Sequence, residues 1–344
     1  MSSKYILTDE HMEFDGTTLY RIKALRDFGD VHAGDVGGWV EHDGDISDDG
    51  SAWVYDGAKI YGGTIVYDDA KVGGNACIMD GRIYGNARVY GNAYVETTHV
   101  YGNAEVYGDA NVHGGDVYGG AKVYGRAEIQ GEAKVYGNAE VYGLSQISDN
   151  AQVYGSAKVH GDGEGYVCVY DNAEVSENAE ICGRASVFGN ARVYGKAKIS
   201  GNAQIYEKAK ICGAKIYDNA EVYGKAYVGG DAKVYDYATV CDKAGVYYDA
   251  KVYGHARIYE WSKVYDNARV YDSAEVYGGA NVYGNAQVHG EAEVSDDAEI
   301  YDDAEIYDNA SIHGCAEVYN GAKVYGNADV GGDDEVCDFD EIYE

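Results

Sequence analysis

A six-residue repeat runs through most of the sequence and limits what this chain can fold into. The stretch Ala87–Asn92, with the sequence Ala-Arg-Val-Tyr-Gly-Asn, recurs in imperfect copies from about Ser51 to the end of the chain. Such a period predicts stacked identical units rather than one globular core. On an extended segment Ala and Val share one face, and Tyr shares the other with the residue between them. Gly and Asn tolerate positive φ, so each unit is one short strand and one corner.

Lapses in the repeat indicate how many units form one turn. The apolar inward position recurs 49 times between Val54 and Ile342, mostly every six residues. Three shortened steps in the first part of the repeat begin at Ile78, Val95 and Val112, and successive ones are 17 residues apart, just under three repeats. The outward Tyr is replaced at nearly the same interval, at Met79, Glu96, His113, Gln130 and Ser148. Both irregularities predict an all-β fold, a left-handed parallel β-helix with three strands per turn and about 16 turns.

The N-terminal segment, up to about Gly50, does not follow the repeat. We expect residues 1–50 to form a small N-terminal β cap and residues 51–344 to form the β-helix. Tyr5–Leu7 and Thr18–Ile22 have the composition of strands, with a tight turn at Asp15–Gly16 between them. A cap that covers the edge of the first turn is favoured over a ligand pocket in this segment.

The net charge of the chain limits the classes of partner that it is expected to bind. There are 59 acidic and 27 basic residues, for a net charge of −32. Nucleic acids and anionic membranes both require a basic patch, so neither is expected as a partner. The N-terminus lacks a signal-peptide pattern, and no apolar stretch is long enough to insert into a membrane. These observations favour cytoplasmic synthesis without a signal peptide. A virion or extracellular location stays open. Seven Cys without CxxC spacing indicate unpaired thiols.

Tyrosine dominates the outward face of the repeat. Thirty of the 37 Tyr directly follow an inward Val or Ile. On each face, neighbouring Tyr are one turn apart, a spacing that suits ring stacking worth ~0.5–1.5 kcal/mol per pair. One interpretation is that Tyr has high strand propensity and fastens adjacent turns together. The other is a flat aromatic surface that binds a glycan, another polymer or a second solenoid. The candidate binding residues are Tyr84, Tyr90, Tyr101, Tyr107, Tyr118, Tyr124, Tyr136, Tyr142, Tyr253, Tyr259, Tyr265, Tyr271, Tyr277 and Tyr283.

Catalytic chemistry has weaker support in the sequence. The nine His have no spacing that would bring three ligands together, so no metal site, cofactor or catalytic residue is expected. Acyl transfer would require a general-base His near a long loop. Ten residues replace six between Val159 and Val169, which predicts an inserted corner loop. His160 beside this loop is the best candidate base and His255 at a corner is the second, although both also fit surface histidines.

The segment Leu25–Glu41, with the sequence LRDFGDVHAGDVGGWVE, is followed by Ala52–Tyr55 and the Tyr-Gly-Asn-Ala repeats. In these features the chain resembles the YdcK-like hexapeptide-repeat β-solenoid family of bacteria and their phages. The resemblance covers nearly the whole chain and implies a left-handed β-helix. It also implies an acyltransferase activity, because members of the family are often described as acyltransferases.

The sequence as a whole favours a non-enzymatic structural or binding rod that displays tyrosine ladders. Its expected partners are further copies of itself, side by side or end to end through an uncapped C-terminal turn, or a glycan or other polymer. One alternative is a trimeric acyltransferase that uses acyl-CoA, with His160 near its site. Another is a glycan-binding appendage on a phage or cell surface.

Overall fold

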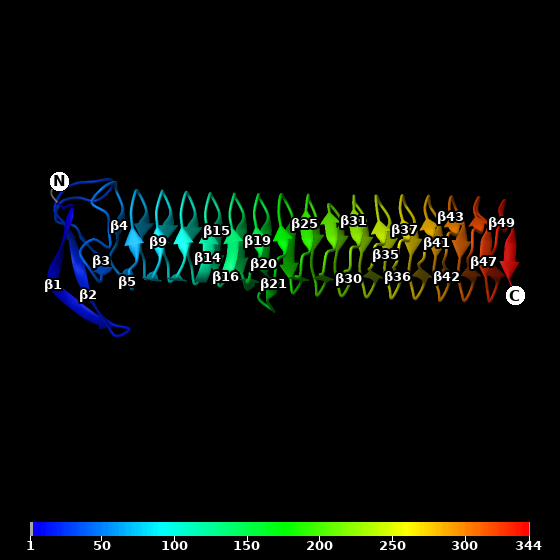
Figure 1. The fold of residues 1–344 in the computed structure, drawn as a ribbon, viewed down its shortest axis with the longest axis horizontal. Coiled ribbons are helices and arrows are strands. Elements are labelled where there is room, and N and C mark those ends of the chain that lie inside the picture. Colours follow the sequence, from blue (N-terminus) through cyan, green and yellow to red (C-terminus); the bar gives the residue numbers. More distant parts are fainter. Residues whose placement is uncertain (1–2, 344) are drawn as a thin grey trace. The chain divides into compact units, whose positions relative to one another are not determined.

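The computed structural model describes residues 3–343, which form two compact units, the first ending at Asp171 and the second beginning at Asn172. In each unit, short strands alternate with tight corners and are stacked turn upon turn (Figure 1). The described residues form no helix, so none of them builds a helix that could cross a membrane. The all-β class predicted from the repeat is confirmed.

The first unit opens with an antiparallel sheet. β1 (Tyr5–Phe14) and β2 (Thr17–Ala24) form a hairpin whose turn residues, Asp15 and Gly16, have φ angles of 51° and 76°. β2 also pairs in antiparallel fashion with β3 (Val36–Val40). The tight turn predicted at Asp15–Gly16 is therefore present.

β3 connects this antiparallel sheet to the first turn of the solenoid. Val40 pairs in parallel with Ile60, and Ile46 forms a parallel bridge with Val66. Together with Val54, these residues make up a turn that precedes the regular repeat, so there are about 17 turns rather than the expected 16. Eight residues rather than six separate Ile46 from Val54, and this longer step hid the turn in the sequence. The boundary at residue 50, as the end of a separate cap, stays a prediction.

Parallel pairing relates each solenoid strand to the strand one turn later. In the first unit Val89 pairs with Val106, and Val106 with Val123. Three strands per turn and this parallel register agree with the predicted left-handed β-helix. The solenoid strands of the first unit are β4 (Trp53–Val54), β5 (Lys59–Tyr61), β6 (Ile65–Val66), β7 (Lys71–Val72), β8 (Cys77–Met79), β9 (Arg82–Ile83), β10 (Arg88–Val89), β11 (Tyr94–Glu96), β12 (His99–Val100), β13 (Glu105–Val106), β14 (Asn111–Val117), β15 (Lys122–Gly125), β16 (Glu128–Val135), β17 (Glu140–Gly143), β18 (Ser145–Ile147), β19 (Gln152–Val153), β20 (Lys158–Gly161) and β21 (Val167–Val169).

The second unit continues the same pattern within itself. Ile199 pairs with Ile216, and Ile216 with Val234, again in parallel. Its strands are β22 (Glu174–Val175), β23 (Glu180–Gly183), β24 (Ser186–Val187), β25 (Arg192–Tyr194), β26 (Lys198–Ile199), β27 (Gln204–Ile205), β28 (Lys210–Cys212), β29 (Lys215–Ile216), β30 (Glu221–Val222), β31 (Tyr227–Gly229), β32 (Lys233–Val234), β33 (Thr239–Val240), β34 (Gly245–Val246), β35 (Lys251–Val252), β36 (Arg257–Ile258), β37 (Lys263–Val264), β38 (Arg269–Val270), β39 (Glu275–Val276), β40 (Asn281–Val282), β41 (Gln287–Val288), β42 (Glu293–Val294), β43 (Glu299–Ile300), β44 (Glu305–Ile306), β45 (Ser311–Ile312), β46 (Glu317–Val318), β47 (Lys323–Tyr325), β48 (Asp329–Val330), β49 (Glu335–Val336) and β50 (Glu341–Tyr343).

The core of each unit is a column of small and branched side chains. Ala87 and Val89, like their equivalents in most other turns, have no exposed surface. Where a hydroxyl replaces the inward Ala, it bonds to a backbone carbonyl: Thr64 Oγ1 donates to Tyr61 O at 2.7 Å, and Ser262 Oγ donates to Tyr259 O at 2.7 Å. Such bonds offset the cost of burying a polar group. The inward faces predicted from the period of six are confirmed.

The corners depend on the fifth position of the repeat. Gly91 there has φ of 74°, and a Cβ would lie 2.7 Å from the backbone nitrogen of Gly108 in the next turn. Asn92 at the sixth position does not share this conformation and instead accepts a hydrogen bond from Asn75 Nδ2 at 3.1 Å. Asp replaces Gly at several fifth positions, as at Asp236, whose carboxylate accepts the backbone N–H of Gly254 at 3.1 Å. This bond helps an L-residue occupy the left-handed region.

Candidate functional site

Two tyrosine ladders cover two faces of the first unit. Their neighbouring rings are parallel, with centroids 4.8 or 4.9 Å apart and interplanar angles of at most 8°. The Tyr67 ladder comprises Tyr67, Tyr84, Tyr101, Tyr118, Tyr136 and Tyr154. The Tyr90 ladder comprises Tyr90, Tyr107, Tyr124, Tyr142 and His160. The tyrosine stacking predicted from the sequence is confirmed.

In the second unit the tyrosines are distributed over three faces. Tyr253, Tyr259 and Tyr265 were predicted as members of one binding set, but they lie on consecutive faces and stack in different ladders. The Tyr217 ladder comprises Tyr217, Tyr235, Tyr253, Tyr271, His289, Tyr307, Tyr325 and Tyr343. The Tyr265 ladder comprises Tyr265, Tyr283, Tyr301 and Tyr319, and Tyr259 pairs with Tyr277.

Several tyrosine hydroxyls donate hydrogen bonds to carboxylates on the next turn. Tyr259 donates to Glu275 at 2.8 Å, and Tyr301 donates to Glu317 at 2.9 Å. Burial against the stack, reinforced by Glu105, raises the pKa of Tyr90 to about 12. The phenols therefore stay protonated and act as donors within the chain. The stack also covers the ring faces, so the ladders present mainly ring edges to solvent. Binding of a partner by these tyrosines stays a prediction.

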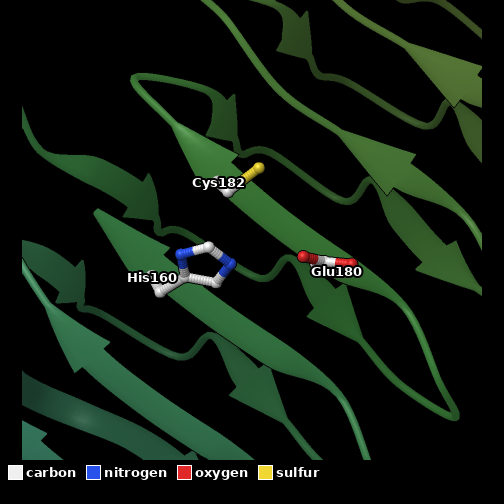
Figure 2. Close-up of side chains that lie close together, drawn as sticks. All are labelled: His160, Glu180 and Cys182. Atoms are coloured by element: carbon white, nitrogen blue, oxygen red, sulfur yellow. The ribbon is translucent and has the colours of Figure 1, made fainter. Parts of the chain in front are cut away.

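His160 and His255 also belong to aromatic stacks. His160 lies on β20 (Figure 2), and its ring stacks on Tyr142 with centroids 4.8 Å apart. His255 stacks on Tyr237 at 5.0 Å. The inserted loop predicted beside His160 is present, as residues 162–166 between β20 and β21. A role for either histidine as a general base stays a prediction.

Charged side chains at the remaining outward position pair across turns. Figure 2 shows Glu180 and Cys182 two residues apart on β23, and Glu180 forms an ion pair with Lys198 of the next turn at 2.7 Å. Lys323 and Glu305 form an equivalent pair at 2.8 Å. Because these side chains are exposed to solvent, each pair contributes little to stability.

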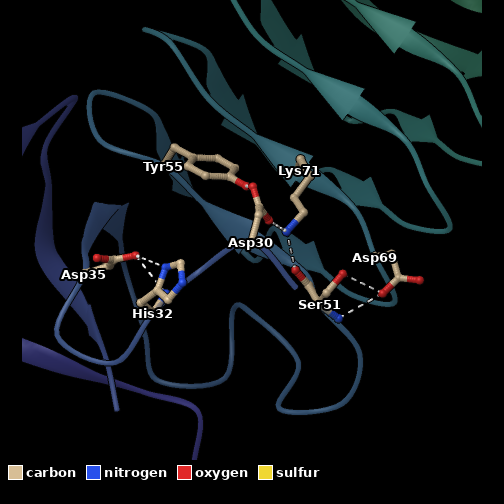
Figure 3. A network of polar contacts seen from close by, with 7 residues as sticks. All are labelled: Asp30, His32, Asp35, Ser51, Tyr55, Asp69 and Lys71. Carbon is tan, nitrogen blue, oxygen red and sulfur yellow. Dashed lines mark hydrogen bonds and ion pairs between the residues drawn. The ribbon is translucent and has the colours of Figure 1, made fainter. Parts of the chain in front are cut away.

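A polar network fastens the loop between β2 and β3 to the first turns of the solenoid (Figure 3). The carboxylate of Asp30 accepts hydrogen bonds from Lys71 Nζ at 2.7 Å and from Tyr55 OH at 2.5 Å. These two donors lower the pKa of Asp30 to about 2. Lys71 Nζ also donates to Ser51 O at 2.7 Å, and Ser51 Oγ donates to Asp69 at 2.7 Å. This network links the loop between β2 and β3 to two turns of the solenoid, because Asp30 binds Tyr55 and Lys71 at once.

A groove of about 790 Å³ runs along one corner of the second unit. It follows strands β27, β30, β33 and β36 on four successive turns. At the sixth position of the repeat these turns carry four exposed side chains, which we term the Lys–Trp corner: Lys208, Lys225, Lys243 and Trp261. Asn190, Glu207, Gly224, Asp242 and Glu260 complete the lining.

The Lys–Trp corner was not identified from the sequence. Trp261 is 59% exposed, and Lys243 Nζ lies 4.8 Å from the centroid of its ring. The available signal was the replacement of the usual Asn by Lys at 208, 225 and 243, each about three repeats after the one before, with Trp at the next such step. The sixth position was interpreted only as part of a turn, so this column was overlooked.

Comparison with known proteins identifies a family of repeats that parts of this chain resemble. A family model described as the YdcK β-solenoid repeat matches residues 82–96 and 145–161. Two segments of the chain thus match the YdcK β-solenoid repeat. The resemblance noted in the sequence is thereby confirmed. The matched YdcK repeats lie in the first unit and include Tyr84, Tyr90, Tyr154 and His160, which belong to its two ladders.

One relative with the YdcK name is similar over part of its length. It is a protein of Escherichia coli (strain K12) named as an uncharacterised acetyltransferase, YdcK, and it is 33% identical to this chain over 90 residues. That alignment covers 24% of this chain and 27% of the relative. The chain thus matches about a quarter of the relative's length.

Proposed function

We propose that this chain is a non-enzymatic scaffold whose tyrosine ladders hold successive turns rigidly and whose side faces associate with a polymer or with further copies of the chain. The observation that carries the proposal is that the tyrosine rings and hydroxyls already contact other groups of the chain. Their ring faces stack 4.6–5.3 Å apart in ladders of up to eight aromatic members, and several hydroxyls donate to Glu of the next turn. Groups committed in this way stabilise a surface and are poorly suited to proton transfer.

The repetition itself favours an extended partner. A catalytic site requires a nucleophile, a base and an orienting group that converge on one point. Each face of this solenoid instead offers similar groups once per turn, about 4.8 Å apart. A partner that also repeats, such as a linear polymer or a second solenoid, could make many weak contacts at once. Linked contacts of this kind give high avidity even where each one is weak.

Association with polymers or copies can be tested on the purified chain. Electron microscopy and sedimentation over a range of concentration and salt should reveal assemblies, or glycan pull-downs should retain the chain. Replacing Tyr107 and Tyr124 together by Leu should weaken that association, whereas Tyr237→Leu, at a corner outside the ladder strands, serves as the matched control. Dispersed monomers that retain no polymer would contradict the proposal.

An acyltransferase is the second candidate, favoured by the name of the Escherichia coli relative and by the position of His160 next to the inserted loop. Such an enzyme would bind acyl-CoA, and hexapeptide acyltransferases are expected to act as trimers. Calorimetry with acetyl-CoA and a measurement of particle mass separate the two candidates. Heat of binding, a trimeric mass and an acetylation rate lost in His160→Ala would favour the enzyme.

A further inference from the structure

We infer that the Lys–Trp corner binds a linear acidic glycan, one whose sugar units carry carboxylates. This inference rests on the proposed scaffold function, because it names the class of polymer and the place where that polymer binds. The corner occupies four successive turns of the second unit and opens into a groove of about 790 Å³. An elongated groove along stacked turns fits a chain of sugar units better than it fits a single compact ligand.

The three ammonium groups of the corner are available to a ligand. In the described part of the chain, none of Lys208, Lys225 and Lys243 has a carboxylate oxygen within 4.0 Å of its Nζ. Two of the nearby carboxylates are engaged elsewhere, since Asp242 accepts the backbone N–H of Glu260 at 3.3 Å and Glu260 accepts that of Gly278 at 3.0 Å. Like charges on adjacent strands destabilise a sheet, and an anionic ligand would relieve that repulsion.

Trp261 supplies an apolar surface at the end of the lysine column. It is 59% exposed, whereas Trp53 is 1% exposed. A large exposed aromatic ring is unusual on a soluble surface and is typical of binding sites. The flat C–H face of a pyranose packs well against an indole ring. Lys243, 4.8 Å from this ring, would place an ammonium group beside a sugar bound there.

The surrounding charge favours an acidic glycan over other anions. The net charge of −32 opposes nucleic acids and anionic membranes, whose charge density is high. Glu207, Asp242 and Glu260 line the same groove and can accept hydrogen bonds from sugar hydroxyls. A neutral glycan would leave the three ammonium groups without a counter-charge. A glycan with both hydroxyls and carboxylates satisfies both sets of groups.

Isothermal titration calorimetry with an oligogalacturonate tests the inference on the full chain. Saturable binding that weakens with added salt is expected, and cellohexaose or inorganic phosphate should bind much more weakly. Lys225→Gln should lower the affinity about tenfold, as expected for loss of one charge-assisted contact. Lys196→Gln, an exposed lysine at the same repeat position on another corner, should leave the affinity unchanged.

Trp261 provides a second readout that does not depend on a charge. Its fluorescence should shift to shorter wavelength when oligogalacturonate binds, and Trp261→Phe should abolish that shift while circular dichroism shows an intact fold. Trp261→Ala should lower the affinity about tenfold. Tyr237→Ala, an exposed aromatic residue at another corner, should have no effect on binding.

The possible outcomes distinguish this inference from the scaffold proposal. No binding of oligogalacturonate, equal binding of cellohexaose or phosphate, or equal affinities of Lys225→Gln and Lys196→Gln would overturn the acidic-glycan site. Assemblies or other polymers that depend on Tyr107 and Tyr124 would still support the scaffold. Acetyl-CoA turnover together with corner-dependent oligogalacturonate binding would overturn the scaffold proposal and support the site.

Discussion

Glu275 accepts a 2.8 Å hydrogen bond from the hydroxyl of Tyr259, which lies one turn earlier on the same face of the solenoid. The same carboxylate accepts a 3.0 Å bond from the guanidinium of Arg257. Glu275 thus links the tyrosine and the arginine of the turn before it. This relationship joins the tyrosine ladders to the charged columns beside them.

Removal of the Tyr259 hydroxyl should loosen the link between these turns. We expect Tyr259→Phe to destabilise the neighbouring turns by about 1–2 kcal/mol, because a hydrogen bond to a charged group is lost while the ring stack is kept. Hydrogen exchange of the amides in β36 and β39 measures the effect locally, as suits a repeat structure. Tyr101→Phe is the control, since the described residues offer its hydroxyl no hydrogen bond. Equal exchange rates in both variants would contradict the prediction.

The tyrosine ladders should make the chain sensitive to alkali. Burial raises the pKa of Tyr90, Tyr124 and Tyr235 from 10.0 to about 12. Between these values the unfolded chain releases protons that the folded chain retains, so unfolding becomes easier as pH rises. The stabilisation is complete below pH 10 and should be lost progressively up to about pH 12.

Thermal unfolding followed across this pH range tests the prediction, with phenolate absorbance recorded on the same samples. The double variant Tyr90→Phe, Tyr124→Phe should show a shallower loss of stability with pH. A single phenolate titration centred on the ordinary pKa of 10.0 would rule out the proposed cause.

The network around Asp30 should stabilise the N-terminal region at neutral pH and fail in acid. Lys71 and Tyr55 lower the pKa of Asp30 from 3.8 to about 2, so its contribution is present above the unfolded value and is lost as pH falls from about 4 to 2. We expect Asp30→Asn to destabilise this region by about 1 kcal/mol at neutral pH, since Asp30 is largely exposed.

At pH 2 the difference between Asp30→Asn and the unaltered chain should vanish. Proteolysis of the loop between β2 and β3 at each pH reports on the region directly. Glu10→Gln removes an exposed carboxylate from β1 and should have no such effect. A constant difference at all pH values would indicate that the carboxylate charge is not responsible.

Corner geometry makes Gly91 intolerant of a side chain. Its φ of 74° is costly for an L-residue, and a Cβ would meet the nitrogen of Gly108 at 2.7 Å. Gly91→Ala should therefore lower the unfolding free energy by at least about 1–2 kcal/mol. Gly73→Ala is the matched control, because its Cβ would lie 3.6 Å from Tyr55, an ordinary contact. Equal melting temperatures of the two variants would disprove this account.

The inward faces of the fold could be predicted because a side chain's face follows directly from the period of the repeat. Val89 and Ala87 are buried as the two-residue alternation requires. The number of strands per turn could be predicted because the missing Tyr at His113 and the shortened step after Val112 each recur once per turn, on one face. The turn containing Val40 and Ile46 could not be predicted because eight residues rather than six separate Ile46 from Val54, and the pairing with Ile60 and Val66 reveals it.

The functional surfaces were harder to predict, because they depend on which residues of successive turns lie side by side on the same face or corner. Tyr253, Tyr259 and Tyr265 occupy the same position of the repeat, yet they face three directions. The bond from Tyr259 to Glu275 joins two different positions of the repeat, and their proximity has no meaning until the faces are assigned. The Lys–Trp corner likewise exists only once the sixth positions of successive turns are placed side by side.

The loop of residues 162–166 adds length at a corner without disturbing the strands on either side. Val141 still pairs with Val159 before the loop, and Ile147 still pairs with Val169 after it. Corners therefore tolerate insertions that strands would not. A foreign peptide grafted at another corner of the same unit would be held at a known number of turns from this loop, so the fold could serve as a molecular ruler with addressable positions about 4.8 Å apart.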